Sequence, residues 1–132
     1  MTARTMDDEA AIEAVLREYA DLTNARDCTG VASRSYRTPV LLVDGNGGHT
    51  AFPDRAALEA GFEAYLEGEE KAGWVSSSIS KMELRLVSKT VALAYVDYHK
   101  TQKHGHAADG WIYIFQKHAG VWRIVCVAAR DV

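Results

Sequence analysis

Several polar residues interrupt otherwise apolar stretches of this sequence, and they are the first candidates for chemistry. Three are the carboxylates Asp44, Asp97 and Asp109, and another is the phenol of Tyr19. A positioned carboxylate can act as a general acid or base, and a buried tyrosine hydroxyl can donate a hydrogen bond to a developing oxyanion. These residue types point to cofactor-independent proton transfer on a small hydrophobic carbonyl or hydroxyl compound.

Tyr19 and Asp44 each have a structural interpretation beside the catalytic one. Tyr19 lies on the apolar stripe of a predicted helix, where it can be a core aromatic residue whose hydroxyl reaches a backbone carbonyl. Asp44 ends the apolar run Val40–Val43, but Gly45 follows it, and Asp-Gly is a common hairpin-turn signal. The structural interpretation is favoured for both residues.

Asp97 and His99 alternate along one face of the predicted strand Thr90–Gln102. The carboxylate can orient the imidazole as a base, or the two can form a polar seam on an exposed or dimer-forming face, which is favoured. The length of the next turn decides their surroundings. A two-residue turn places them on the face of Ile112, and a three-residue turn places them on the face of Trp111.

A third group lies on the predicted strand Ala107–Lys117, where Asp109, Trp111, Tyr113 and Phe115 share one face. Asp109 can be a general acid or base, or a solvated residue at the start of the strand. The aromatic residues can orient a ligand, or they can form a core or dimer stripe. The opposite face is expected to hold Ile112, Ile114, Ile124 and Cys126.

The remaining polar residues argue against a metal site and a cofactor. His99, His104 and His106 lie near one another in the sequence, but the ligand spacing of a tetrahedral zinc site is missing. The two cysteines, Cys28 and Cys126, are far apart, which fits free thiols in a reducing compartment. We therefore expect a cytoplasmic protein without a bound metal or cofactor.

Length and composition describe an ordinary globular domain. The chain has 132 residues, 48% of them hydrophobic and 25% charged, which predicts a single domain over residues 1–132. The formal net charge of −3 and the lack of a basic face argue against nucleic acid as a partner. No signal peptide and no membrane-spanning apolar stretch is recognisable, so neither export nor a membrane partner is expected.

Apolar periodicity predicts three helices in the first half of the chain. Helical spacing covers Asp8–Asp27, with Thr5 and Asp8 resembling a capping box. A shorter helix is expected over Thr29–Tyr36. Another long helix should begin after Asp54, a suitable N-cap, and stop at Gly73.

Strands are predicted mainly in the second half. The first, Val40–Val43, precedes a glycine-rich turn, and Trp74 is expected to close one end of the core. After Trp74 the apolar period changes to two, and the short turns require antiparallel neighbours. The four strands predicted there are Ser76–Val87, Thr90–Gln102, Ala107–Lys117 and Val121–Arg130.

This order of elements indicates an α+β fold in which three N-terminal helices cover one face of a bent sheet. The order resembles that of the nuclear transport factor 2-like superfamily, and in particular its SnoaL-like branch. The residues that carry the resemblance are Ile12–Asp27, the segment Asp54–Leu58 with Phe62, and the segment Gly120–Ile124. The resemblance implies a cone-shaped roll of a bent antiparallel or mixed sheet.

The resemblance also implies a ligand pocket inside the cone, for which we expect a volume of several hundred cubic ångströms. The residues expected to line it are Leu16, Phe62, Trp111, Tyr113 and Phe115. In the ketosteroid-isomerase relatives, a tyrosine at the position of Tyr19 serves the oxyanion and a carboxylate near the position of Asp44 is the general base. Trp111 stands where those enzymes carry a second oxyanion-hole acid, which argues against a standard ketosteroid isomerase.

Two functions remain open at this point. The first is an isomerase, cyclase or dehydratase that uses Tyr19, Asp44, Asp97, His99 or Asp109 on a small hydrophobic molecule. The second is a non-catalytic ligand-binding or dimerisation module of the same fold. In either case the resemblance implies a homodimer that forms through the sheet.

Overall fold

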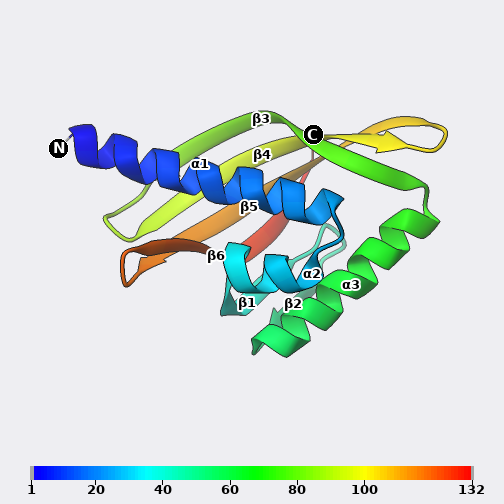
Figure 1. Ribbon diagram of the computed structural model, residues 1–132, viewed down its shortest axis with the longest axis horizontal. Coiled ribbons are helices and arrows are strands. Elements are labelled where there is room, and N and C mark those ends of the chain that lie inside the picture. The colour runs from blue at the N-terminus through cyan, green and yellow to red at the C-terminus, as the bar shows by residue number, and fades with distance from the viewer. Residues whose placement is uncertain (1, 132) are drawn as a thin grey trace.

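The computed structural model describes residues 2–131, which form one curved sheet with helices packed against one side of it (Figure 1). The chain begins with α1 (Thr2–Asn24), the short α2 (Cys28–Gly30) and a single π-helical turn, η1 (Val31–Ser35). The long α3 (Arg55–Lys71) separates the first two strands from the last four. The strands are β1 (Tyr36–Val43), β2 (His49–Phe52), β3 (Trp74–Leu86), β4 (Val91–Gln102), β5 (Gly105–His118) and β6 (Val121–Arg130).

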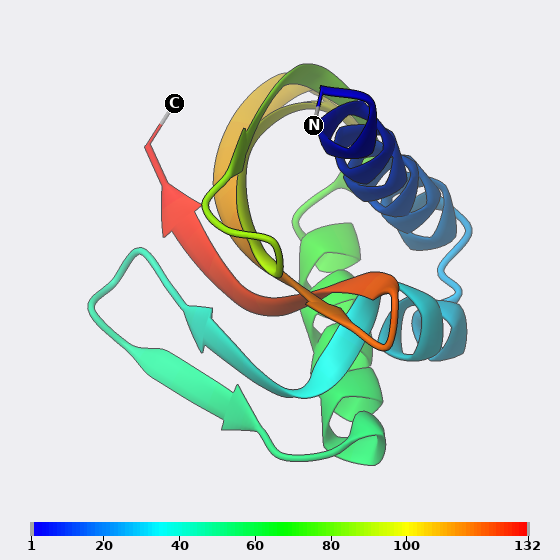
Figure 2. The same ribbon diagram turned by 90° about the vertical axis from the view of Figure 1, so that its left-hand side faces the viewer.

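The strands form a mixed sheet in the order β2-β1-β6-β5-β4-β3. Every neighbouring pair is antiparallel except β1 with β6. The long strands curl so that the concave face of the sheet is turned toward α1 and α3 (Figure 2). The sheet stays open, with β2 and β3 at its edges. The predicted α+β roll of a bent mixed sheet covered by three helices is confirmed.

Helix α3 begins and ends where its sequence signals indicate. Asp54 Oδ1 accepts a hydrogen bond of 2.9 Å from the backbone N–H of Ala57, as an N-cap does. Gly73 follows the helix with a φ of 103°, a conformation that glycine adopts without strain. Within α3, Gly61 leaves room for Phe52, because a Cβ at Gly61 would lie 2.4 Å from that ring. This close approach holds α3 against β2.

The start of α1 is fastened to the hairpin between β5 and β6. Asp8 Oδ1 accepts hydrogen bonds from Lys117 Nζ and from Trp122 Nε1, both at 3.1 Å. The helix already begins at Thr2, so the predicted capping box of Thr5 with Asp8 is wrong. Asp8 lies inside the helix and connects it to the sheet instead.

The end of α1 is fastened to β3 by one asparagine. Asn24 Nδ2 donates a hydrogen bond of 2.8 Å to the backbone oxygen of Ser77, and Asn24 Oδ1 accepts one of 2.9 Å from the Ser77 N–H. The neighbouring Arg26 stacks over the ring of Trp74 at 4.1 Å and donates to the backbone oxygen of Val75 at 2.9 Å. These contacts fix the end of α1 over the first residues of β3.

The first part of the sheet differs from the prediction. The short helix predicted over Thr29–Tyr36 ends at Ser35 and includes the π-helical turn, and β1 begins at Tyr36 rather than Val40. Strand β2 was not predicted at all. Its residues, His49–Phe52, are mostly exposed and show no apolar alternation, so the strand depends on backbone pairing with β1 rather than on a buried face.

A bulge between β5 and β6 corrects one predicted face. Ile114 pairs with Cys126, but the register then shifts and Phe115 pairs with Ile124. The extra residue inverts the alternation, so Ile124 is fully buried on the concave side while Cys126 stays with Ile114 on the convex side. The prediction that Ile124 shares a face with Cys126 is therefore wrong.

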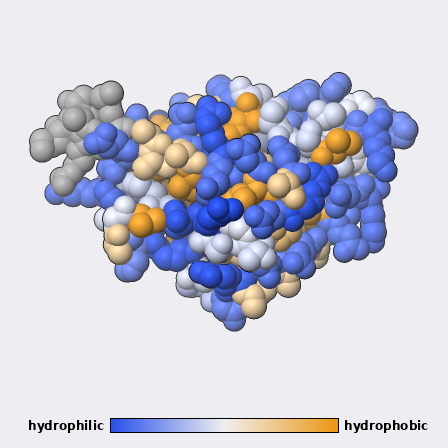
Figure 3. All heavy atoms as spheres, in the orientation of Figure 1, coloured by the Kyte–Doolittle hydropathy of each residue, from blue (hydrophilic) through white to orange (hydrophobic). Residues whose placement is uncertain are grey.

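The core lies between the helices and the concave face of the sheet. Ile12 and Leu16 of α1 and Ile124 of β6 are completely buried there, and Trp122 is buried as well. On the side of the molecule where α1 lies, hydrophobic residues form only small patches among hydrophilic ones (Figure 3). No described helix combines the length and the apolar character needed to cross a bilayer.

We predict that Asn24→Ala lowers the free energy of unfolding by about 1–3 kcal/mol, because it leaves the Ser77 amide and carbonyl without their partners. Urea denaturation of both proteins measures the difference. Asn46→Ala is the matched control, since Asn46 is exposed in the turn between β1 and β2, and it should change stability by less than about 0.5 kcal/mol. Equal effects of the two substitutions would contradict the stabilising role of the hydrogen bonds between Asn24 and Ser77.

Candidate active site

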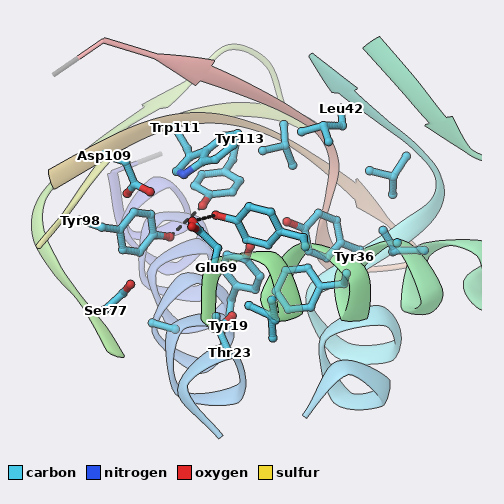
Figure 4. A pocket seen from close by; sticks show the side chains of 18 of the residues that line it. Tyr19, Thr23, Tyr36, Leu42, Glu69, Ser77, Tyr98, Asp109, Trp111 and Tyr113 are labelled. Carbon is cyan, nitrogen blue, oxygen red and sulfur yellow. Dashed lines mark hydrogen bonds between the residues drawn. The ribbon is translucent and has the colours of Figure 1, made fainter. Parts of the chain in front are cut away.

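A cavity of about 120 Å³ lies between α1, α3 and the concave face of the sheet (Figure 4). Its walls are mostly aromatic and aliphatic, with a few polar groups. The volume is below the several hundred cubic ångströms expected from the sequence, and it suits one small ring, since a void of about 150 Å³ accommodates benzene. The side chains that line it and matter below are Tyr19, Tyr36, Phe62, Tyr65, Glu69, Trp74, Tyr98, Lys100, Asp109, Trp111 and Tyr113.

The register between β4 and β5 places these side chains. The turn between the strands consists of two residues, because Gln102 pairs directly with Gly105. Asp109 then lies opposite Tyr98, and the alternation of side chains directs both into the cavity. Trp111 also lines the cavity, on the same strand face as Asp109.

Four tyrosines converge inside the cavity. The hydroxyls of Tyr98 and Tyr113 are hydrogen-bonded at 2.8 Å. The ring of Tyr19 packs edge-on against Tyr36 and Tyr113, with ring centres 5.5 Å and 5.9 Å away. Figure 4 shows the hydroxyl-bearing ends of these side chains directed toward the middle of the cavity. They form a polar centre inside an apolar wall.

The Tyr19 side chain is buried beside the side chains of Tyr36 and Tyr113. Burial raises the pKa of Tyr19, but polar interactions with the hydroxyls of Tyr36 and Tyr113 oppose that rise. Burial places the pKa of Tyr36 and that of Tyr113 well above the usual value. The neighbouring hydroxyls therefore offset part of the effect of burial on the Tyr19 hydroxyl, which lines the same cavity as Asp109.

A charged group borders the tyrosines. Lys100 Nζ lies 3.0 Å from Glu69 Oε1 and 3.7 Å from Asp109 Oδ2, and Tyr65 donates a hydrogen bond of 3.0 Å to the same Glu69 oxygen. The Lys100 side chain is only 12% exposed, so this ion pair is screened less than a surface pair. One ammonium group thus serves two carboxylates.

Asp109 carries the perturbed carboxyl group of the cavity. Burial raises its pKa, while the charge of Lys100 and the side chain of Trp111 lower it and the charge of Glu69 raises it further. The net direction is upward, so desolvation outweighs the attraction of the lysine. A carboxylate with a raised pKa is a stronger base than an ordinary aspartate, and its acid form is present at higher pH.

This arrangement can move a proton on a bound carbonyl compound. Asp109 supplies a carboxyl group that can take up or deliver a proton, and Tyr19 supplies a hydroxyl that can stabilise negative charge on oxygen. Both line the same small cavity.

Asp97 and His99 lie on the opposite, convex face of the sheet. The two-residue turn decides between the two registers and places Asp97 with Ile112 rather than with Trp111. Asp97 forms an ion pair with Arg130, and His99 Nε2 lies 3.1 Å from His106 Nδ1. Neither residue lines the cavity, so the structure does not bring them together with Asp109 and Tyr19, and their placement fits the polar-seam interpretation.

Asp44 is also outside the cavity. Its Oδ1 accepts hydrogen bonds from the backbone N–H groups of Asn46, at 2.8 Å, and Gly48, at 3.0 Å. The carboxylate organises the turn between β1 and β2, as the turn interpretation expects, and it does not lie with the residues of the cavity. Leu16 and Phe115 were predicted to line the pocket, but both are completely buried in the core and do not line it.

Several residues that line the cavity were not predicted from the sequence. Tyr98 and Lys100 alternate with Asp97 and His99 in β4, so a firm choice of turn length would have identified them. Trp74 was predicted to be a plug, and it is both buried and part of the cavity wall. Glu69 gave no signal, because it looks like one more charged residue near the end of an amphipathic helix.

A metal centre receives no support from the described part of the chain. No group of three or more histidine, cysteine, aspartate or glutamate side chains among residues 2–131 is placed to hold an ion. The polar side chains that line the cavity include Glu69 and Asp109 with Lys100, the tyrosines, and the hydroxyl-bearing Thr23 and Ser77.

Solved structures of other proteins share this fold. A proposed scytalone dehydratase from Novosphingobium aromaticivorans has a TM-score of 0.74 at 15% identity, covering 100% of this chain and 89% of its own. A protein of unknown function from Mycobacterium tuberculosis has a TM-score of 0.78 at 16% identity, covering 99% of this chain and 75% of its own. An NTF2-like protein of unknown function from Shewanella oneidensis has a TM-score of 0.76 at 13% identity, covering 94% and 99%.

Sequence comparison gives the family. None of the curated proteins matches the chain. The family model described as NTF2-like protein (DUF6841) matches residues 7–132, which is nearly the whole chain. The resemblance inferred from the order of elements is confirmed, and the chain belongs to the NTF2-like family DUF6841.

Proposed function

We propose that this protein binds a small, single-ring carbonyl or hydroxyl compound and catalyses a proton transfer on it without a cofactor. The observation that carries the proposal is the carboxyl of Asp109, whose pKa is raised, in the same apolar cavity as the hydroxyl of Tyr19. A perturbed acid and an oxyanion donor in one small pocket are the parts that such a reaction needs.

The reaction follows from these two groups. The Asp109 carboxylate takes a proton from the carbon next to the carbonyl, and the electron pair of the broken C–H bond moves into the carbonyl to form an enolate. The enolate oxygen accepts a hydrogen bond from Tyr19, which Tyr36 and Tyr113 support. Asp109 then returns the proton to another carbon, which gives an isomer, or to a departing hydroxyl, which gives a dehydrated product.

The dehydratase branch has one further support. A structural neighbour over the whole length of this chain is a proposed scytalone dehydratase, although at 15% identity the likeness shows the fold alone. The second candidate function is ligand binding without chemistry. It is favoured by the bond between Tyr98 and Tyr113, because two hydroxyls that satisfy each other need no substrate oxygen.

We expect the wild-type protein to accelerate hydrogen–deuterium exchange at the acidic carbons of cyclohex-2-enone, or loss of water from 3-hydroxycyclohexanone, as followed by NMR. Asp109→Asn should lower the rate by about 100-fold or more, because it removes the acid–base group. Tyr19→Phe should lower it by about 100-fold, because the enolate loses its donor.

Asp97→Asn is the matched control for that experiment. It makes the same change of carboxylate to amide on the convex face, where Asp97 is paired with Arg130, and it should leave the rate unchanged. A wild-type protein that binds these compounds in the cavity and accelerates neither reaction would support the binding module instead.

The raised pKa of Asp109 also predicts how stability depends on pH. The folded state holds this proton more tightly than the unfolded state, so its stabilising effect is present at low pH and is lost as pH rises through the folded pKa. The free energy of unfolding of Asp109→Asn, measured relative to that of the wild type, should therefore be higher at pH 7 than at pH 4. Urea denaturation at both values measures this change.

Asp21→Asn is the control for this experiment. It removes one negative charge at an exposed site on α1 and so measures the effect of the change in net charge alone. A stability difference between Asp109→Asn and wild type that is constant with pH, or that falls as pH rises, would contradict the assignment.

We also propose that two copies associate through the convex face of the sheet, as the sequence led us to expect. Tyr95 pairs with Ile112 there, and Ile114 with Cys126, and these side chains are only half-buried on the side away from the helices. Half-buried apolar side chains grouped on one sheet face favour association. Both cysteines are free, which fits the cytoplasm that we propose as the location.

Light scattering after gel filtration should give a dimer for the wild type at micromolar concentration. Ile112→Lys should give a monomer, because it places a charge on the apolar face. Val87→Lys makes the same type of change at an exposed position after β3 and should remain dimeric. A strictly monomeric wild type would contradict this proposal.

A further inference from the structure

A second hollow, of about 250 Å³, shares Tyr36 with the cavity. It is formed where the start of β1 extends beyond the end of β2, because β2 pairs only with residues 40–43 of β1. Its walls come from η1, from the first turn of α3 and from the hairpin between β5 and β6. Figures 1 and 2 both show that hairpin beside the short helical turns that precede β1.

The charged side chains of this hollow are all basic. Arg37, Arg55, Arg123 and His118 line it, and no aspartate or glutamate does. They come from β1, from the start of α3 and from the hairpin between β5 and β6, so only the fold brings these three segments together. Such a cluster of basic side chains stands out in a chain whose formal net charge is −3.

The three arginines have no carboxylate to neutralise them. None of them forms an ion pair with any described residue. Arg37 donates instead to the neutral side-chain oxygen of Gln116, and Arg123 donates to the backbone oxygen of Trp122 at 2.8 Å. These neutral acceptors orient the guanidinium groups and leave their charge available.

Asp54 precedes Arg55 in the sequence, but its carboxylate already has another partner. It caps α3 through the N–H of Ala57 and does not line the hollow. Three guanidinium groups held around one space repel one another, and an anion bound between them removes that cost. Guanidinium groups also match the oxygen pairs of a phosphate in geometry.

We propose that this hollow is a binding site for a phosphate group with two negative charges, carried by a small molecule. Arg37, Arg55 and Arg123 would bind the phosphate oxygens, and the hydroxyl of Thr38, which also lines the hollow, can donate a further hydrogen bond. The volume leaves space for a substituent beside the phosphate. The proposal does not rest on the proton-transfer function, because Tyr36 is the one described residue that lines both spaces.

Titration calorimetry at low ionic strength tests the proposal with inorganic phosphate and with phenyl phosphate. We expect saturable binding of one equivalent, weakened by about tenfold or more in Arg123→Gln and in Arg55→Gln. Arg123→Lys keeps the charge but loses the planar pair of donors, so it should fall between wild type and Arg123→Gln. Tighter binding of phenyl phosphate would identify a phosphorylated compound, and equal binding would identify the free ion.

Arg85→Gln is the control, because this arginine lies on β3 and is not part of the hollow. It should bind both probes as the wild type does. Thermal melting without ligand checks that every variant is folded, and exchange of cyclohex-2-enone should be unchanged in Arg123→Gln. The proposal is overturned if neither probe binds at millimolar concentration, if Arg85→Gln weakens binding as much as Arg123→Gln does, or if chloride and acetate bind as tightly as phosphate.

Discussion

The pairing register of β4 with β5 is the constraint on which the cavity depends. Side chains of a strand alternate between its two faces, so a shift of one residue would exchange the two sets. With the two-residue turn, Tyr98 and Lys100 face inward, and Asp97 and His99 face outward. The shape of a turn at the end of a hairpin therefore selects the chemistry in the middle of the molecule.

Burial and polar contact oppose each other inside the cavity. The apolar wall disfavours charge on Asp109 and on the tyrosines, whereas Lys100 and the neighbouring hydroxyls favour it. For Asp109 burial is the larger effect, which leaves a carboxyl group able to exchange its proton. For Tyr19 the neighbouring hydroxyls partly offset the rise in pKa that burial causes. A fully apolar cavity of this size would bind a ring equally well and would have no means of acting on it.

The sequence was sufficient to predict the long helices and strands and part of the site. Strong periodicity made α1, α3 and the four long strands predictable, and the fold followed from their order. Tyr19, Phe62, Asp109, Trp111 and Tyr113 were predicted to be site residues and do line the cavity.

The features that could not be predicted from the sequence have physical causes. Strand β2 has no buried face, so it left no pattern, and the bulge near Phe115 inverted an alternation that was assumed to be continuous. The arginines of the second hollow belong to different elements, and local spacing carries no information about such a cluster. Glu69 was missed for the same reason, since it meets Lys100 only in the folded chain.

Tyr36 belongs to the walls of both hollows, and this has a thermodynamic consequence. If an occupant on one side shifts the position of this ring or its interaction with Tyr19, it changes the binding free energy on the other side. Linkage requires the reverse effect to be equal, so each ligand would alter the affinity of the other by the same factor. A single aromatic side chain is then enough to connect two ligands that never touch.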